Sequence, residues 1–208
     1  MRLFVGLSWM CSWLLACASS PSVTGETQNY GLRDNWVWVR GPWDQVEPSR
    51  DVDEVIDQLC PAIMHLPLVQ QGEYGQEYCG ALYLLDGSYY ASHPSPLGAM
   101  VRVAGRERRQ CKPPRYVEDS RGQPTPLADF HSHPWGNSPM SQQDRRGPNQ
   151  LWSIRIQFDT RCRVMKLIPY LEEERPGELY ERQGRLWKLI GIIKSEDKES
   201  GIVTAVDG

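Results

Sequence analysis

The stretch DFHSHPWGNSPMSQQD, residues 129–144, decides how this chain is interpreted. If its first residues form a strand, His131 and His133 point to the same face, because side chains on a strand alternate with a period of two. Their Cα atoms would then lie about 6.5 to 7 Å apart, a span that two imidazole rings can close onto one metal ion. The pattern therefore predicts a pair of metal-binding histidines.

A loop and then a short helix near residue 140 are predicted to follow the histidines. Ser138 is expected to cap this helix, with Pro139 at its first position. Ser141 and Asp144 are three residues apart and would share one helical face. The helix can thus bring a carboxylate to the two imidazoles, although the same serine and aspartate could form no more than a capping box.

Two neutral imidazoles, one carboxylate and an open fourth position are typical of a catalytic zinc site rather than a structural one. We therefore expect His131, His133 and Asp144 to bind Zn²⁺. Zinc lowers the pKa of its bound water to roughly 7 and polarises a carbonyl group. Such a site also needs a carboxylate that takes the proton from the water.

The pattern HSHP at 131–134, followed by SQQD at 141–144, resembles the JAMM (MPN-plus) zinc metalloproteases. In that family H-x-H is followed after ten residues by an aspartate, with proline after the second histidine and a serine three residues before the aspartate. A glutamate lies on an upstream strand, often followed by a small residue or cysteine and a glycine, and EYCG at 77–80 fits this pattern. The resemblance covers roughly residues 50–193.

This resemblance implies both residue roles and a fold. Glu77 would be the general base, Ser141 would hydrogen-bond the tetrahedral oxyanion, and Asp144 would be the third metal ligand. The implied fold class is α/β, a single MPN-like (cytidine-deaminase-like) domain with a mixed, largely antiparallel sheet flanked by helices. The implied reaction is the hydrolysis of peptide or isopeptide bonds.

The first residues, 1–16, are expected to be a lipoprotein signal peptide. Arg2 precedes an apolar run at 3–15 that is too short to span a bilayer as a mature helix. The run ends in LLAC at 14–17, which resembles the lipobox of bacterial lipoproteins. The resemblance implies that Cys17 carries lipid and anchors the protein to a membrane of the bacterial cell envelope, outside the cytoplasm. An ordinary secretory signal is the alternative.

The net charge and the cysteine content indicate which partners and which cellular compartment to expect. The formal net charge is −3, so the chain lacks the basic footprint of nucleic-acid-binding proteins, and no nucleic-acid partner is expected. Beyond Cys17, an even number of cysteines remains, which favours disulfides in an oxidising compartment and allows three pairings. These cysteines are Cys60, Cys79, Cys111 and Cys162.

The remaining sequence divides into a polar tether and Trp-rich lead-in at 17–45, a catalytic domain at 46–194 and a flexible tail at 195–208. A helix is expected from Ser49, with Pro61 limiting its C-terminal end. Asp86-Gly87 predicts a hairpin, and the basic run at 106–114 is expected to be a solvated loop that could touch an acidic partner. Strands are expected at 36–39, 77–85, 88–92, 100–103, 127–131, 151–158, 162–168, 179–182 and 185–193.

The substrate class follows from the compartment. A bacterial protein outside the cytoplasm would not meet ubiquitin-like proteins, the best-known substrates of the family. The expected partner is instead a peptide or protein substrate, and cell-wall peptide is one candidate. Two alternatives remain: a non-catalytic envelope lipoprotein that uses an MPN-like domain and Trp36, Trp38 and Trp43 as a binding or assembly module, and a domain in which zinc is only structural.

Overall fold

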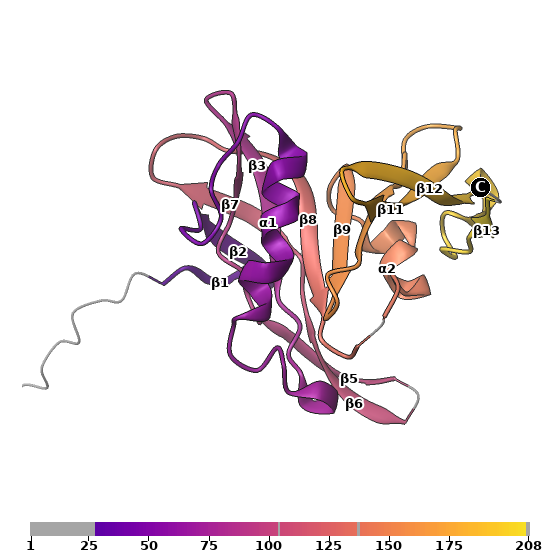
Figure 1. The fold of residues 1–208 in the computed structure, drawn as a ribbon, viewed down its shortest axis with the longest axis horizontal. Coiled ribbons are helices and arrows are strands. Elements are labelled where there is room, and N and C mark those ends of the chain that lie inside the picture. The colour runs from indigo at the N-terminus through magenta and orange to yellow at the C-terminus, as the bar shows by residue number, and fades with distance from the viewer. Residues whose placement is uncertain (1–27, 104, 137, 207–208) are drawn as a thin grey trace, which may run out of the picture.

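The computed structural model describes residues 28–103, 105–136 and 138–206 (Figure 1). The expected signal peptide at 1–16 and the lipid-bearing Cys17 lie outside the described residues. Within the described ranges, no helix has the length and apolar character needed to cross a membrane.

The structure is mostly β, with 45% of residues in strands and 14% in helices. The predicted α/β domain of MPN type, with helices flanking the sheet, is therefore wrong. In the described part of the chain there are two α-helices, and one of them has only four residues. The physical reason is that a second, smaller sheet covers part of the large sheet where the prediction required helices.

Eight strands form one mixed sheet in which β8 and β9 run parallel and the other neighbours run antiparallel. Their spatial order is β13 (Thr204–Ala205), β12 (Leu186–Ile193), β11 (Gly177–Gln183), β10 (Val164–Ile168), β9 (Ile154–Asp159), β8 (Thr125–His133), β3 (Cys79–Leu85) and β4 (Ser88–Ala91). The hairpin predicted at Asp86-Gly87 is confirmed, because Leu85 pairs with Ser88 across it.

Helix α1 (Val52–Met64) begins two residues later than the sequence suggested. Asp51 is its N-cap and accepts a hydrogen bond from the backbone N–H of Asp53. Ser49 lies outside the helix, and its hydroxyl accepts a hydrogen bond from the backbone N–H of Asp51. Pro61 lies inside the helix rather than at its end. The helix tolerates this proline because its apolar stripe is anchored in the main core.

The main core lies between α1 and strands β3, β8 and β9 (Figure 1). Phe130 of β8 is fully buried there, beside Leu59 of the helix and Phe158 of β9. Gly80 of β3 permits this packing, since a Cβ at that position would lie 2.1 Å from the Phe130 ring. The opposite faces of the same strands carry the candidate site.

A second sheet contains β1 (Tyr30–Arg33), β2 (Trp36–Gly41) and β7 (Pro114–Asp119), with β2 and β7 parallel. Val37 and Val39 pack from it onto Ala81 of β3. The expected lead-in thus contributes two strands to the fold. Trp43 is buried in the main core, so the three tryptophans do not form one exposed surface.

The basic run predicted as a loop is instead a strand. β6 (Arg106–Cys111) pairs antiparallel with β5 (Gly98–Val103) to form a separate hairpin, which extends from the body in Figure 1. The prediction failed because charge suggested solvent, whereas strand formation was decided by pairing with β5 and by docking of β6 on the chain before β3.

The C-terminal stretch was expected to be a flexible tail. It instead includes β13, which pairs antiparallel with β12. Its carbonyl groups from Lys198 to Gly201 accept hydrogen bonds from residues of and after α2 (Gln142–Arg145). Gly201 has a φ of 71°, and a Cβ there would lie 2.6 Å from the Gln142 carbonyl oxygen. In the ranges that the structure describes, three short 3-10 helices complete the fold: Gly72–Tyr74, Gly147–Asn149 and Ser195–Asp197.

Candidate metal centre

His131, His133 and Asp144 converge at the end of β8 and in α2. Their candidate ligand atoms all lie within 4.8 Å of one another. The Asp144 carboxylate oxygens lie 3.6 Å from His131 Nε2 and 3.4 Å from His133 Nε2. Adjacent ligand atoms of a tetrahedral zinc site, with bonds of about 2.0 to 2.1 Å, are about 3.4 Å apart. The spacing therefore fits zinc.

The electrostatic state of His131 and Asp144 also fits a metal site. His131 Nε2 is buried and has no hydrogen-bond partner, which is costly unless the nitrogen finds an acceptor of its lone pair. Burial lowers the pKa of His131, which keeps the imidazole neutral. Burial raises the pKa of Asp144, but the neighbouring His131 and His133 more than offset this, so its pKa lies well below the ordinary value. Neutral imidazoles and an ionised carboxylate are the forms that bind metal.

The two histidines owe their common orientation to the strand. Both are buried on β8, and Ser132 between them points to the other face, where its hydroxyl accepts a hydrogen bond from the Tyr78 backbone at 2.9 Å. On the ring of His133, Nδ1 lies 3.0 Å from the Ser138 hydroxyl. A hydrogen bond at Nδ1 fixes the ring and leaves Nε2 able to bind a metal. Ser138, predicted as a helix cap, therefore orients a candidate ligand instead.

Helix α2 is capped by Ser141, three residues later than predicted. The Ser141 hydroxyl accepts from the Asp144 backbone at 3.1 Å, and the Ser141 backbone donates to Asp144 Oδ2 at 3.0 Å. This is a complete capping box. The Ser141 hydroxyl also donates to Asp144 Oδ2 at 2.5 Å, so the box that caps the N-terminus of the helix orients the third candidate ligand.

Contacts to the rest of the molecule hold this four-residue helix in place. The carbonyl oxygen of Asp144 accepts hydrogen bonds from Arg155 at 2.8 Å and from Gln150 at 2.5 Å. Arg155 lies on β9 and also forms a two-point buried ion pair with Asp129 of β8, at 2.8 and 2.9 Å. One guanidinium thus joins the strand that carries the histidines to the helix that carries Asp144.

Sequence analysis missed Arg155, Asp129 and Gln150 as parts of the site. Arg155 and Asp129 each interrupt an apolar strand pattern, and a charge in a buried strand normally needs a partner. That signal was present, but pairing them required knowing that β8 and β9 are neighbours. Gln150 follows α2 closely and gave no comparable signal.

Glu77 lies beside the three candidate ligands, two residues before β3. Its Oε1 is 3.8 Å from His133 Nε2, and its Oε2 accepts a hydrogen bond from the Cys111 backbone at 3.2 Å. The side chain is only 5% exposed. Burial and the nearby negative charge of Asp144 raise the pKa of Glu77 well above its ordinary value. A raised pKa suits a carboxylate that accepts and returns protons.

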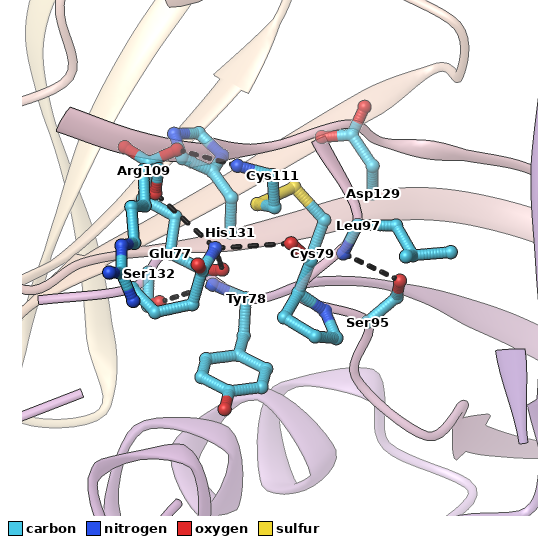
Figure 2. Close-up of a disulfide and its surroundings, with 12 residues drawn as sticks. Glu77, Tyr78, Cys79, Ser95, Leu97, Arg109, Cys111, Asp129, His131 and Ser132 are labelled. Carbon is cyan, nitrogen blue, oxygen red and sulfur yellow. Dashed lines mark hydrogen bonds between the residues drawn. A yellow bond between two sulfur atoms is a disulfide. The ribbon is translucent and has the colours of Figure 1, made fainter. Parts of the chain in front are cut away.

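The four remaining cysteines form two disulfides, a pairing that the sequence left open. One links Cys79 to Cys111 and ties the end of β6 to the start of β3 (Figure 2). Figure 2 shows this bridge next to Glu77 and His131. The other links Cys60 of α1 to Cys162, in the turn after β9. The first bridge therefore borders the site, and the second lies on the α1 side of the sheet.

The site opens into a cleft with two hollows that meet at Glu77. One hollow reaches His133 and is walled by Trp135, whose ring centre is 5.8 Å from that of His133. The other reaches His131 and Asp144.

Comparisons with known proteins do not identify the chain: no protein-family model, curated protein or solved structure matches it. The functional assignment therefore depends on the geometry of the site and on the motif that carries it.

Proposed function

We propose that this protein is a zinc-dependent hydrolase of peptide or isopeptide bonds with a site of the JAMM type. The observation that carries the proposal is the convergence of His131, His133 and Asp144 at zinc-like spacing, with the buried Glu77 beside them. A structural zinc site has four protein ligands, whereas three ligands leave one position for water and substrate.

The residues take complementary roles in the proposed reaction. When bound, zinc polarises a substrate carbonyl and makes water acidic enough to lose a proton near pH 7. Glu77 accepts that proton at a carboxylate oxygen and returns it to the leaving nitrogen, because its carboxylate is the buried one next to the ligand set. Ser141 lies on the cleft wall, and its hydroxyl is the proposed donor to the oxyanion, a role in which its proton would turn away from Asp144 Oδ2, to which it donates in this structure.

We further propose that the protein acts in the bacterial cell envelope, held to a membrane by lipid on Cys17. Two disulfides in the described residues suit an oxidising compartment. A peptide or protein of that compartment is the proposed substrate. The alternative of a tryptophan-rich binding surface is disfavoured because Trp43 is only 4% exposed.

Metal analysis and a peptide library test the proposal together. The purified protein should contain about one zinc per chain. Cleavage of a quenched-fluorescence peptide library should stop on chelation and return when zinc is added. Substoichiometric zinc in a folded, zinc-supplemented sample would contradict the assignment, as would cleavage that is indifferent to chelators.

A further inference from the structure

Strand β9 carries two buried polar residues beside the histidines of β8. In the parallel register of the two strands, Gln157 lies opposite His131 and Asp159 lies opposite His133. Gln157 is only 1% exposed, and Asp159 is fully buried. Burying an amide or a carboxylate costs free energy unless its hydrogen bonds are made, so the partners of these two residues indicate what they do.

Ser138, five residues after His133, is held by both of these side chains. Asp159 Oδ2 accepts a hydrogen bond from the Ser138 backbone N–H at 3.2 Å. The side-chain amide of Gln157 donates to the Ser138 carbonyl oxygen at 2.9 Å. With its backbone fixed at both polar groups, Ser138 directs its hydroxyl to His133 Nδ1, 3.0 Å away. Two buried side chains of β9 are thus connected to a candidate metal ligand through one serine.

Asp159 uses its two oxygens for two different segments of the chain. Oδ1 accepts hydrogen bonds from the backbone N–H groups of Arg161 and Arg163, at 2.9 and 3.2 Å, and so holds the turn that follows β9. An asparagine could serve that turn equally well, because its single amide oxygen can accept from both donors. The second oxygen, which makes the residue a buried carboxylate, is used instead by Ser138.

We propose that Asp159 is a positioning residue for His133 and that it acts through Ser138. Asp159 and Gln157 fix the Ser138 backbone, and the fixed hydroxyl holds the His133 ring so that its Nε2 lies 3.4 Å from the Asp144 carboxylate. Partners that orient a metal-binding histidine typically contribute about 10- to 100-fold to metal affinity. This inference rests on the proposed function, because it takes His133 as a zinc ligand.

Zinc affinity of full-length variants, measured by competition with a chromophoric chelator, tests the proposal. Asp159→Asn keeps one oxygen for the turn and places an amide NH₂ against the Ser138 backbone N–H. Zinc affinity should therefore fall about tenfold. Ser138→Ala removes the hydroxyl itself and should lower the affinity by the same factor or more. Wild-type zinc affinity in Asp159→Asn would overturn the proposal.

The double variant that combines Ser138→Ala with Asp159→Asn shows whether Asp159 acts through Ser138. It should bind zinc no more weakly than Ser138→Ala alone, because the hydroxyl that Asp159 positions is already absent. Two losses that multiply in the double variant would show that Asp159 affects the metal centre by another route, and would overturn the proposed path.

Asp119→Asn is the matched control for a general loss of stability. The Asp119 side chain is also fully buried, and its Oδ1 accepts from the backbone N–H of Arg121 in a turn, at 3.0 Å. It lines neither hollow of the site. This variant should lower the free energy of unfolding and leave zinc affinity unchanged. A loss of zinc affinity equal to that of Asp159→Asn would assign the effect to stability and overturn the positioning role.

Histidine ¹⁵N NMR spectra of the metal-free proteins separate this inference from the proposed function. The ring nitrogen signals of His133 should shift in Asp159→Asn and in Ser138→Ala, but not in Asp119→Asn. If these shifts occur and not even the wild type binds zinc, the metal centre is contradicted and the path from Asp159 to His133 stands. If the wild type binds zinc and the His133 signals of Asp159→Asn are unchanged, the positioning role is overturned and the metal centre stands.

Discussion

The two faces of β8 and β9 differ sharply, although the same strands carry both. One face packs against α1 through Ala128, Phe130, Ile156 and Phe158. The other face buries Asp129, His131, His133, Arg155 and Gln157. Burial of polar groups costs free energy unless each finds a partner, and His131 Nε2 and Gln157 Oε1 have none, so this second face cannot be explained by stability alone. The apolar face forms the main core and stabilises the fold. The polar face, which we call the site face, carries the side chains of the candidate site.

The largest expected effect lies on the site face. Glu77→Gln removes the proton acceptor but preserves the size of the side chain and an oxygen that can accept from the Cys111 backbone. We expect kcat to fall about 10³-fold, because a positioned general base contributes roughly 10² to 10⁴. Zinc content, measured by elemental analysis, should stay at the wild-type level. Wild-type activity in this variant would remove Glu77 from its proposed role.

The next largest effect is a loss of stability from a substitution on the apolar face. Phe130→Ala leaves a cavity in the main core and should lower the free energy of unfolding by about 3 to 5 kcal/mol, measured by urea denaturation.

His131→Leu is the matched change one residue away. It removes a buried nitrogen that has no partner, although it also removes a neighbour of the Asp144 carboxylate, so the metal-free protein should lose far less stability than Phe130→Ala does. Zinc should raise the melting temperature of the wild type and not of this variant, because only a protein that binds the ion is stabilised by it. A large loss of metal-free stability in His131→Leu would contradict the distinction between the faces.

Much of this arrangement is local in the sequence, and that part was predictable. Alternation along β8 places both histidines on one face. The apolar stripe of α1 and the Asp86-Gly87 turn are equally local, and each indicates its element without knowledge of the rest of the chain.

The unpredicted part depends on contacts between distant segments. β6 is a strand because it pairs with β5 and docks beside Glu77, although its arginines suggested a solvated loop. Parallel pairing of β2 with β7 likewise joins segments that no local pattern connects.

A smaller effect is expected from the ion pair that links β8, β9 and α2. Arg155→Met leaves the buried Asp129 without its partner, which should cost about 3 kcal/mol in unfolding free energy. Adding Asp129→Leu should restore most of that stability, because an apolar pair of similar volume replaces a buried ion pair at little cost.

The same double variant shows whether Arg155 positions the third ligand. The Asp144 carbonyl has lost one of its donors, so zinc affinity should remain about 10- to 100-fold below that of the wild type even when stability is restored. Competition with a chromophoric chelator measures this affinity. Wild-type affinity in the double variant would show that Arg155 serves only the fold.

The smallest expected difference separates the two disulfides. Loop-closure entropy favours the Cys60–Cys162 bridge, which spans 102 residues, over the Cys79–Cys111 bridge, which spans 32. Replacing the first pair by alanine should therefore cost about 1 kcal/mol more stability than replacing the second. Activity should follow the opposite order, because the Cys111 backbone donates to Glu77 and its bridge ties β6 to β3 beside the ligands. Urea denaturation and kcat measured on both variants test the two orders, and a larger activity loss on removing Cys60–Cys162, at temperatures where both variants are folded, would contradict a positioning role for the bridge at the site.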